Sequence, residues 1–168
     1  MKLRKLIIED APLMLEWMHD PSVVRNMQTD FSRKELKDCI AFIHAAEMDD
    51  GNLHLAIADD DNIYQGTVSL KHFRNGTAEF AITIRKSAMG TGVASLAMKE
   101  IIRRGFEGCG LKQIYWCVNP ENKRAVRFYD KNQYNRICVR ECPELMENIQ
   151  GYTEQQIDSY IWYFVNNG

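Results

Sequence analysis

The stretch Met89-Gly90-Thr91-Gly92-Val93-Ala94 lies where a run with strand alternation gives way to a run with helix periodicity. Before it, residues 78–84 read Ala-Glu-Phe-Ala-Ile-Thr-Ile, which places Phe80, Ile82 and Ile84 on one face of a strand. After it, apolar residues recur at the three- and four-residue spacing of an amphipathic helix: Val93, Leu96, Ala97, Ile101 and Ile102. The stretch therefore predicts a strand, a glycine turn and a helix in immediate succession.

The glycine turn is suited to binding an anion. The first turn of a helix leaves backbone N–H groups without partners, and the helix dipole favours negative charge there. Gly90 and Gly92 carry no Cβ, so a phosphate group can approach the backbone closely. A Gly-x-Gly pair is also common by chance, so this stretch alone leaves an ordinary strand-to-helix turn as the alternative.

Length and composition favour one globular domain over residues 1–168. The chain is 45% hydrophobic and 26% charged, and it is long enough to bury a core without disulfides. Its formal net charge of −2 provides no overall basic field, so we expect no nucleic-acid partner. No apolar stretch has the length of a signal peptide or a membrane span, so we expect no membrane partner either.

The cysteines and histidines indicate neither a disulfide framework nor a metal site. Five cysteines form an odd set without a Cys-x-x-Cys pair, which favours reduced thiols and a cytoplasmic location. The four histidines show no metal-ligand spacing, so we expect each to be structural or exposed, and no metal cofactor: His19, His44, His54 and His72.

The rest of the chain predicts a mixed α/β fold. Alternating or apolar runs predict seven strands, at residues 2–8, 53–57, 63–70, 78–84, 113–118, 134–139 and 157–165. Helix signals occur at residues 11–17, 33–48, 90–106 and 122–129, with Asp10 and Ser32 as expected N-caps of the first two. The connection 140–154 has no clear pattern, and the last strand is suited either to closing the sheet or to pairing across a dimer.

The order of these motifs resembles the GNAT family of acetyl-CoA-dependent N-acetyltransferases. The resemblance rests on a strand with an acidic residue, a Gly-x-Gly-x-Ala turn, a helix, and then a second strand and helix that carry Val118-Asn119-Pro120, Asn122, Ala125 and Phe128-Tyr129. Met89 departs from the family pattern, which has glutamine or arginine there. The resemblance implies a single acetyltransferase domain with a mostly antiparallel sheet of about seven strands, flanked by helices.

The resemblance also implies acetyl-CoA as cosubstrate. Its pyrophosphate would bind the backbone amides of Met89, Gly90, Thr91, Gly92, Val93 and Ala94, and its pantetheine arm would run beside Ile82, Thr83 and Ile84, whose N–H groups would hold the acetyl oxygen. Asn119 and Asn122 match positions that contact the coenzyme arm, although Asn122 is equally suited to be a helix N-cap. Arg124, with Lys123 and Arg127, is suited to a coenzyme phosphate or to a solvated helix face.

Two residues are the candidate catalytic groups. Tyr129 matches the family tyrosine near the thioester sulfur, where a phenol can protonate the leaving thiolate; packing on the sheet is its alternative role. Glu79 lies on the strand expected to line the cleft and can take the amine's proton directly or through a water, or it is merely a solvated residue of a strand face. We interpret Cys117 as a core thiol.

The predicted reaction is direct acetyl transfer to a primary amine of a small molecule. Residues 16–27 are similar to enzymes that acetylate amino groups on nucleotide-linked sugars, which is the acceptor that we favour. The same residues are also similar to acetyltransferases of ribosomal-protein amino termini, and a non-catalytic CoA-binding sensor is a third alternative. The sequence leaves open whether the protein is a monomer or a homodimer.

Overall fold

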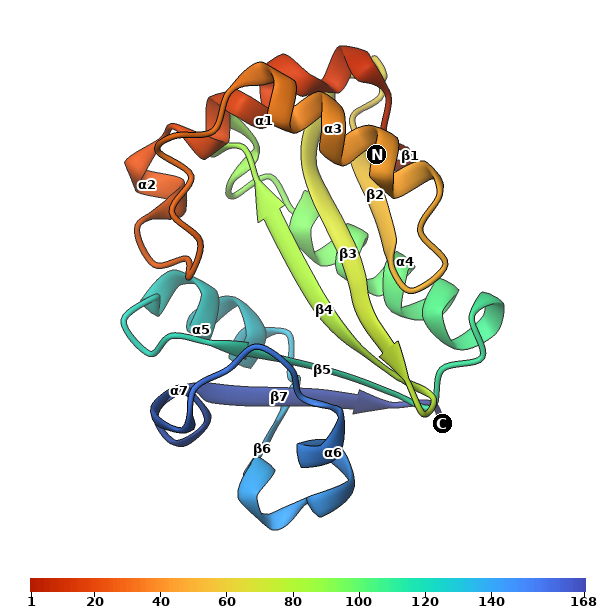
Figure 1. The fold of residues 1–168 in the computed structure, drawn as a ribbon, viewed down its shortest axis with the longest axis vertical. Coiled ribbons are helices and arrows are strands. Elements are labelled where there is room, and N and C mark those ends of the chain that lie inside the picture. Colours follow the sequence, from red (N-terminus) through yellow and green to blue (C-terminus); the bar gives the residue numbers. More distant parts are fainter.

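The computed structural model describes residues 1–168 as a seven-stranded sheet flanked by helices (Figure 1). The strands are β1 Lys2–Lys5, β2 Leu53–Ala58, β3 Tyr64–Arg74, β4 Thr77–Ile84, β5 Gln113–Val118, β6 Asn135–Ile137 and β7 Ile161–Asn166. The α-helices are α1 Ala11–Met18, α2 Pro21–Val24, α3 Leu36–Glu47, α4 Val93–Gly108, α5 Lys123–Lys131, α6 Pro143–Asn148 and α7 Glu154–Ser159. None of the helices is long and apolar enough to cross a bilayer.

The sheet is antiparallel except at one place, which confirms the predicted fold class. Its strand order is β1-β2-β3-β4-β5-β7-β6, and only β4 and β5 are parallel, joined through α4. The last strand, β7, pairs with β5 on one edge and with β6 on the other. Trp162, Tyr163 and Phe164 of β7 are thus paired on both edges within the chain, and β6 is the edge strand at this end of the sheet.

The parallel pair is short, and the sheet opens beyond it. Only three residue pairs join the strands, Thr77–Gln113, Ala78–Ile114 and Glu79–Tyr115. Figure 1 shows β4 and β5 starting together near the carboxyl terminus and then running apart. Beyond Glu79 and Tyr115, the facing edges of the two strands therefore have no partner strand.

The two faces of the sheet are covered differently. On one face, α4 and α5 pack over a core that includes Phe80, Ile101, Trp116 and Tyr129. The opposite face carries two separate clusters, one under α1 and α3 around Trp17 and Ile43, and one under residues 139–162 that contains Tyr115 and Trp162. Because side chains alternate along a strand, Phe80 and Trp116 face α4 and α5, whereas Glu79 and Tyr115 face the opposite side.

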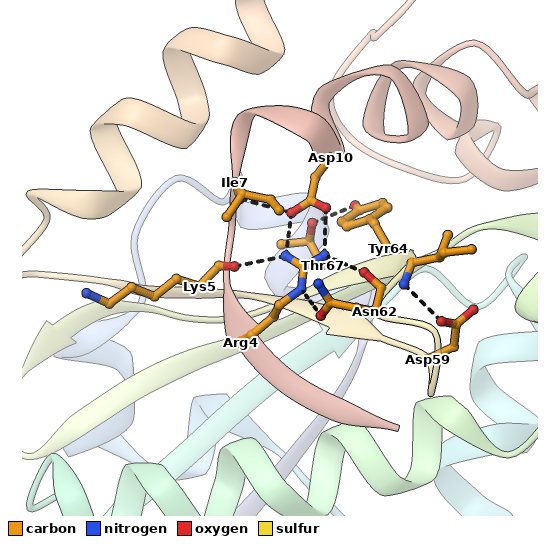
Figure 2. Close-up of polar contacts among 9 residues, drawn as sticks. Arg4, Lys5, Ile7, Asp10, Asp59, Asn62, Tyr64 and Thr67 are labelled. Atoms are coloured by element: carbon orange, nitrogen blue, oxygen red, sulfur yellow. Dashed lines mark hydrogen bonds and ion pairs between the residues drawn. The ribbon is translucent and has the colours of Figure 1, made fainter.

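A partly buried ion pair fixes the start of the chain (Figure 2). The guanidinium of Arg4 donates to both carboxylate oxygens of Asp10 at 2.8 Å, and Asp10 also accepts from the backbone N–H of Ile7 at 3.0 Å. The Nε of Arg4 donates to Asn62 at 2.9 Å, which ties β1 to the turn between β2 and β3. Asp10 lies at the predicted N-cap position of α1, but its side chain makes no capping hydrogen bond, because the carboxylate accepts from Arg4 and Ile7.

Several predicted boundaries were wrong. The first strand ends at Lys5, since Ile8–Asp10 form a 3-10 turn. Helix α3 begins at Leu36, because the capping box is made by Glu35 and Asp38, with Glu35 rather than Ser32 as N-cap. The predicted strand at 157–165 begins only at Ile161, because residues 154–159 form α7, and the unassigned connection before it contains α6.

Candidate active site

The glycine turn has the predicted form. Lys86–Ala88 make one 3-10 turn, Met89 follows in an extended conformation, and α4 begins at Val93. Gly90 and Gly92 have φ angles of +78° and +88°, a left-handed region in which a side chain would be strained. A Cβ on either glycine would meet nothing within 4 Å, so the space beside both backbones is open.

Part of the predicted set of backbone N–H groups at this turn is available to a ligand, because those of Met89 and Thr91 already donate to the carbonyls of Lys86 and Ala88. Those of Gly92, Val93 and Ala94 donate to no backbone carbonyl, as expected for the first turn of a helix. The hydroxyl of Thr91 folds back on the carbonyl of Ala88 at 2.6 Å, so it does not fill the open space. The turn therefore has the donors and the room for a pyrophosphate.

Arg124 reaches the same turn from α5. Its Nη1 lies 2.9 Å from the sulfur of Met89, and the Arg124 side chain is exposed. A cation thus lies beside position 89, and it comes from α5. Among the three basic residues predicted for a coenzyme phosphate, Arg124 is the one that contacts the turn.

The unpaired edge of β4 and the start of α5 lie on the two sides of the opening in the sheet. Ile82 and Thr83 are half-buried and Ile84 is buried. Asn122 caps α5, since its Oδ1 accepts from the N–H of Ala125 at 3.2 Å, and Asn119 accepts from the N–H of Glu121 at 3.0 Å. The side-chain N–H groups of both asparagines donate to no protein atom, so they remain available to a ligand.

Tyr129 is buried, and its hydroxyl has no hydrogen-bond partner. The residue is 7% exposed, and its ring packs against Trp116 and Tyr163 with centroids 5.4 and 5.1 Å apart. Burial raises the pKa of Tyr129 well above that of an ordinary tyrosine. The phenol therefore keeps its proton at neutral pH and has that proton free to donate. Packing and proton donation are both compatible with this position.

Glu79 is buried, which corrects the alternative that it is a solvated residue of a strand face. It is 3% exposed, and its carboxylate accepts hydrogen bonds from the hydroxyl of Tyr152 and from Nδ1 of His72, the latter at 2.9 Å. Glu79 is also the last residue of β4 that pairs with β5. The carboxylate thus lies where the sheet opens, on the face opposite to Tyr129.

Neither partner of Glu79 was predicted to belong to the site. Tyr152 lies in the unassigned connection, 73 positions from Glu79, where no pattern points to the strand. His72 was expected to be structural or exposed, and regular alternation along β3 would turn it away from the face that carries Glu79. The only available signal for His72 was its position just before the Asn75-Gly76 turn, where irregular pairing is common.

Cys117 lies on the same face, half-buried beside Tyr152. Burial raises the pKa of the Cys117 thiol to about 12, and the nearby charge of Glu79 acts in the same direction. The thiol therefore stays protonated and is a poor nucleophile, in agreement with its interpretation as a structural residue.

Comparisons with known proteins agree with the resemblance to the GNAT family. The family model described as Acetyltransferase (GNAT) domain matches residues 1–135. An uncharacterized N-acetyltransferase, p20 of Bacillus licheniformis, is 27% identical over 141 residues, which cover 80% of this chain and 78% of that protein.

Solved structures share the fold over nearly the whole chain. The spermidine N-acetyltransferase of Vibrio cholerae in complex with CoA and spermine superposes with a TM-score of 0.78 at 16% identity, covering 98% of this chain and 94% of that one. An acetyltransferase (GNAT family) from Bacillus anthracis gives 0.74 at 19% identity, with 98% and 93% coverage. Since the family model spans residues 1–135 of the 168, the chain belongs to the GNAT family of acetyl-CoA-dependent N-acetyltransferases.

Proposed function

We propose that this enzyme transfers the acetyl group of acetyl-CoA directly to a primary amine of a small molecule, with both substrates bound at once. The observation that carries the proposal is the placement of Tyr129 and the Glu79 carboxylate on opposite faces of the sheet, at the point where β4 and β5 part. A thioester entering from one face can then meet an amine arriving from the other.

The groups suited to the coenzyme are free to bind it. The N–H groups of Gly92, Val93 and Ala94, together with the guanidinium of Arg124, are suited to the pyrophosphate. The pantetheine arm contains amides, and the unpaired edge of β4 at Ile82–Ile84 offers backbone groups that can pair with them. Asn119 and Asn122 would contact the arm from the start of α5.

The chemistry follows from the same placement. The amine nitrogen attacks the thioester carbonyl, a C–N bond forms, and the C–S bond then breaks. Backbone N–H groups of β4 stabilise the oxyanion, and the hydroxyl of Tyr129 gives its proton to the departing thiolate. The proton lost by the amine is drawn toward the negative charge of Glu79.

Our favoured acceptor is an amino group on a nucleotide-linked sugar, on the basis of residues 16–27. In the structure Trp17 belongs to the core, where its indole N–H donates to Tyr64 at 2.9 Å, and Glu16 pairs with Arg85 at 2.9 Å. These residues therefore hold α1 over the end of β4 and do not themselves provide a sugar platform. Because the similar Vibrio cholerae protein is a spermidine N-acetyltransferase, a polyamine is the second acceptor to test.

The experiment measures CoA release with a thiol reagent. Acetyl-CoA is incubated with a nucleotide-linked aminodeoxy sugar, spermidine, or peptides bearing a ribosomal-protein amino terminus, and with no acceptor as the control for thioester hydrolysis. We expect amine-dependent release that is fastest with the amino sugar, together with the acetylated amine by mass spectrometry. Preference for the peptides or for spermidine would overturn the acceptor class. Tight CoA binding by calorimetry without release on any amine would instead support the non-catalytic sensor.

A further inference from the structure

The carboxylate of Glu79 already uses both of its oxygens. One oxygen accepts from the hydroxyl of Tyr152, and the other accepts from Nδ1 of His72 at 2.9 Å. Only about 5% of the Glu79 side chain is exposed, against 36% of the His72 side chain. Protons can therefore pass between this cluster and solvent through the His72 imidazole, whereas the Glu79 carboxylate is nearly closed to water.

The backbone is distorted so that His72 can make this contact. The pairing of β3 with β4 shifts register between Lys71 and Arg74, and His72 has a φ of +56°, which is unusual for a residue with a side chain. The N–H of His72 is held by the side chain of Asn52 at 2.9 Å. Lys71 pairs directly with Glu79 across the strands, and the irregularity brings His72 to Glu79 as well.

The contact with the carboxylate selects one state of the imidazole. A carboxylate accepts and does not donate, so Nδ1 carries the hydrogen that faces Glu79. In the neutral ring the lone pair then lies on Nε2, which makes no hydrogen bond with the protein. A histidine oriented by a carboxylate with its other nitrogen free is the arrangement that enzymes use for a general base.

We propose that His72 is the base that takes the proton from the acceptor amine, with Glu79 as the residue that positions the imidazole and Tyr152 as a brace on the carboxylate. This assignment rests on the proposed function. In the step, the N–H bond of the amine breaks and an N–H bond forms at Nε2 of His72, which gives an imidazolium facing the Glu79 carboxylate. The imidazolium then releases the proton to solvent, and the cycle restarts.

Other titratable groups surround the pair. Lys71 on β3 pairs with Glu79 across the strands and carries a positive charge. From β5, Tyr115 and Cys117 face the carboxylate, and burial raises the pKa of both groups, so they stay neutral.

Two further titratable groups lie near Asn52, the residue that accepts from the N–H of His72. Asp49 accepts from the Asn52 side chain, and burial lowers the pKa of His54. The hydrogen bond to the Glu79 carboxylate is the contact that the His72 ring makes with a charged group.

The pH dependence of turnover tests which residue of the pair takes the proton and which one positions the other. His72→Asn suits the left-handed backbone and can still contact Glu79, but it cannot take up a proton. We expect about a 100-fold lower kcat, an unchanged KM for acetyl-CoA, and loss of the limb in which the wild-type rate rises with pH as the base deprotonates. Glu79→Gln should keep that limb but move it to lower pH, because the imidazolium loses its counter-charge. If Glu79 were the base, Glu79→Gln would abolish the limb and His72→Asn would only shift it.

A second variant separates chemistry from folding. His72→Gly removes the ring without backbone strain and leaves a half-exposed space, so free imidazole should restore turnover in proportion to its concentration. His44→Asn, an exposed residue of α3, is the matched control and should behave as wild type. A wild-type rate and pH profile in His72→Asn, or a folded His72→Gly that does not respond to imidazole, would overturn the assignment. Absence of acetyl transfer by the wild-type enzyme to any amine would instead refute the proposed function.

Discussion

Arg124 on α5 places Nη1 2.9 Å from the sulfur of Met89, so two segments 35 positions apart meet at the mouth of the glycine turn. A thioether is a weak acceptor that a guanidinium readily leaves for an anion. The contact therefore holds the Arg124 side chain beside the open space at Gly90 and Gly92, where a phosphate would displace the sulfur as its partner.

Removing this cation should weaken coenzyme binding. Arg124→Gln loses a charge-assisted hydrogen bond, which is worth about 1.5–3 kcal/mol, so the Kd for CoA should rise about 10-fold or more. Calorimetry at two salt concentrations measures the effect, and the salt dependence of Kd should be smaller in the variant. Lys131→Gln, two turns further along the same helix, is the control. If the Kd for CoA rose equally in both variants, the effect would come from the overall positive charge of α5 and not from a contact at the turn.

Filling the open space at the turn should weaken CoA binding beyond what the loss of stability alone explains. Gly92→Ala forces an alanine into a left-handed conformation, at a cost of about 1–2 kcal/mol in the free energy of unfolding, and its methyl group occupies the space beside the free N–H groups. We expect lower stability and weaker CoA binding. Gly110→Ala is the matched control, because Gly110 also has positive φ, +66°, with nothing near its Cβ. It should lose stability by a similar amount and bind CoA normally.

The hydroxyl of Tyr129 should affect turnover and leave folding intact. Tyr129→Phe keeps the ring contacts with Trp116 and Tyr163 and removes only an oxygen that bonds to nothing, so the melting temperature should not fall. The kcat should drop about 100-fold with the Kd for CoA unchanged. Because burial raises the pKa of Tyr129, the wild-type rate should not decline through the ordinary range of tyrosine titration. Tyr134→Phe, whose ring also packs on Trp116, is the control and should keep its activity.

The Arg4–Asp10 pair should contribute strongly to stability. Asp10→Ala leaves Arg4, whose side chain is only 16% exposed, without its counter-charge, and should lower the free energy of unfolding by about 3 kcal/mol in urea denaturation. Adding Arg4→Met should restore part of that loss, because the uncompensated charge is removed. Asp60→Asn, in the exposed pair with the amino terminus, should cause no measurable change. If the double variant were less stable than Asp10→Ala alone, the loss would not come from an unpaired charge.

Local pattern was enough to predict the strand, glycine turn and helix on which the proposed coenzyme site rests. The strand, the two glycines and the helix of residues 78–108 follow from alternation, missing Cβ atoms and helical spacing, all of which act over a few residues. The fold class was also predictable, because seven strand signals imply a sheet whose connections are limited. Asn122 as the N-cap of α5 belongs to the same group of short-range effects.

The cluster around Glu79 could not be predicted in this way. The Glu79 carboxylate accepts a hydrogen bond from Tyr152, and that contact depends on the path of the chain after β6. His72 faces Glu79 because a register shift interrupts the alternation that sequence reasoning assumes. The placement of β7 between β5 and β6 likewise comes from pairing between distant segments.

The brevity of the β4–β5 pairing has a further consequence. From Phe80 on β4 and from Trp116 on β5, the sheet has two free edges that lie in its middle and not at its rim. Free edges attract extended chains, and proteins normally cover them or blunt them with charge. An amide-containing coenzyme arm seated between these strands would complete the sheet as an eighth, removable strand. The enzyme would then be most prone to aggregate immediately after it releases CoA. Purification with the coenzyme present would keep the facing edges of β4 and β5 covered.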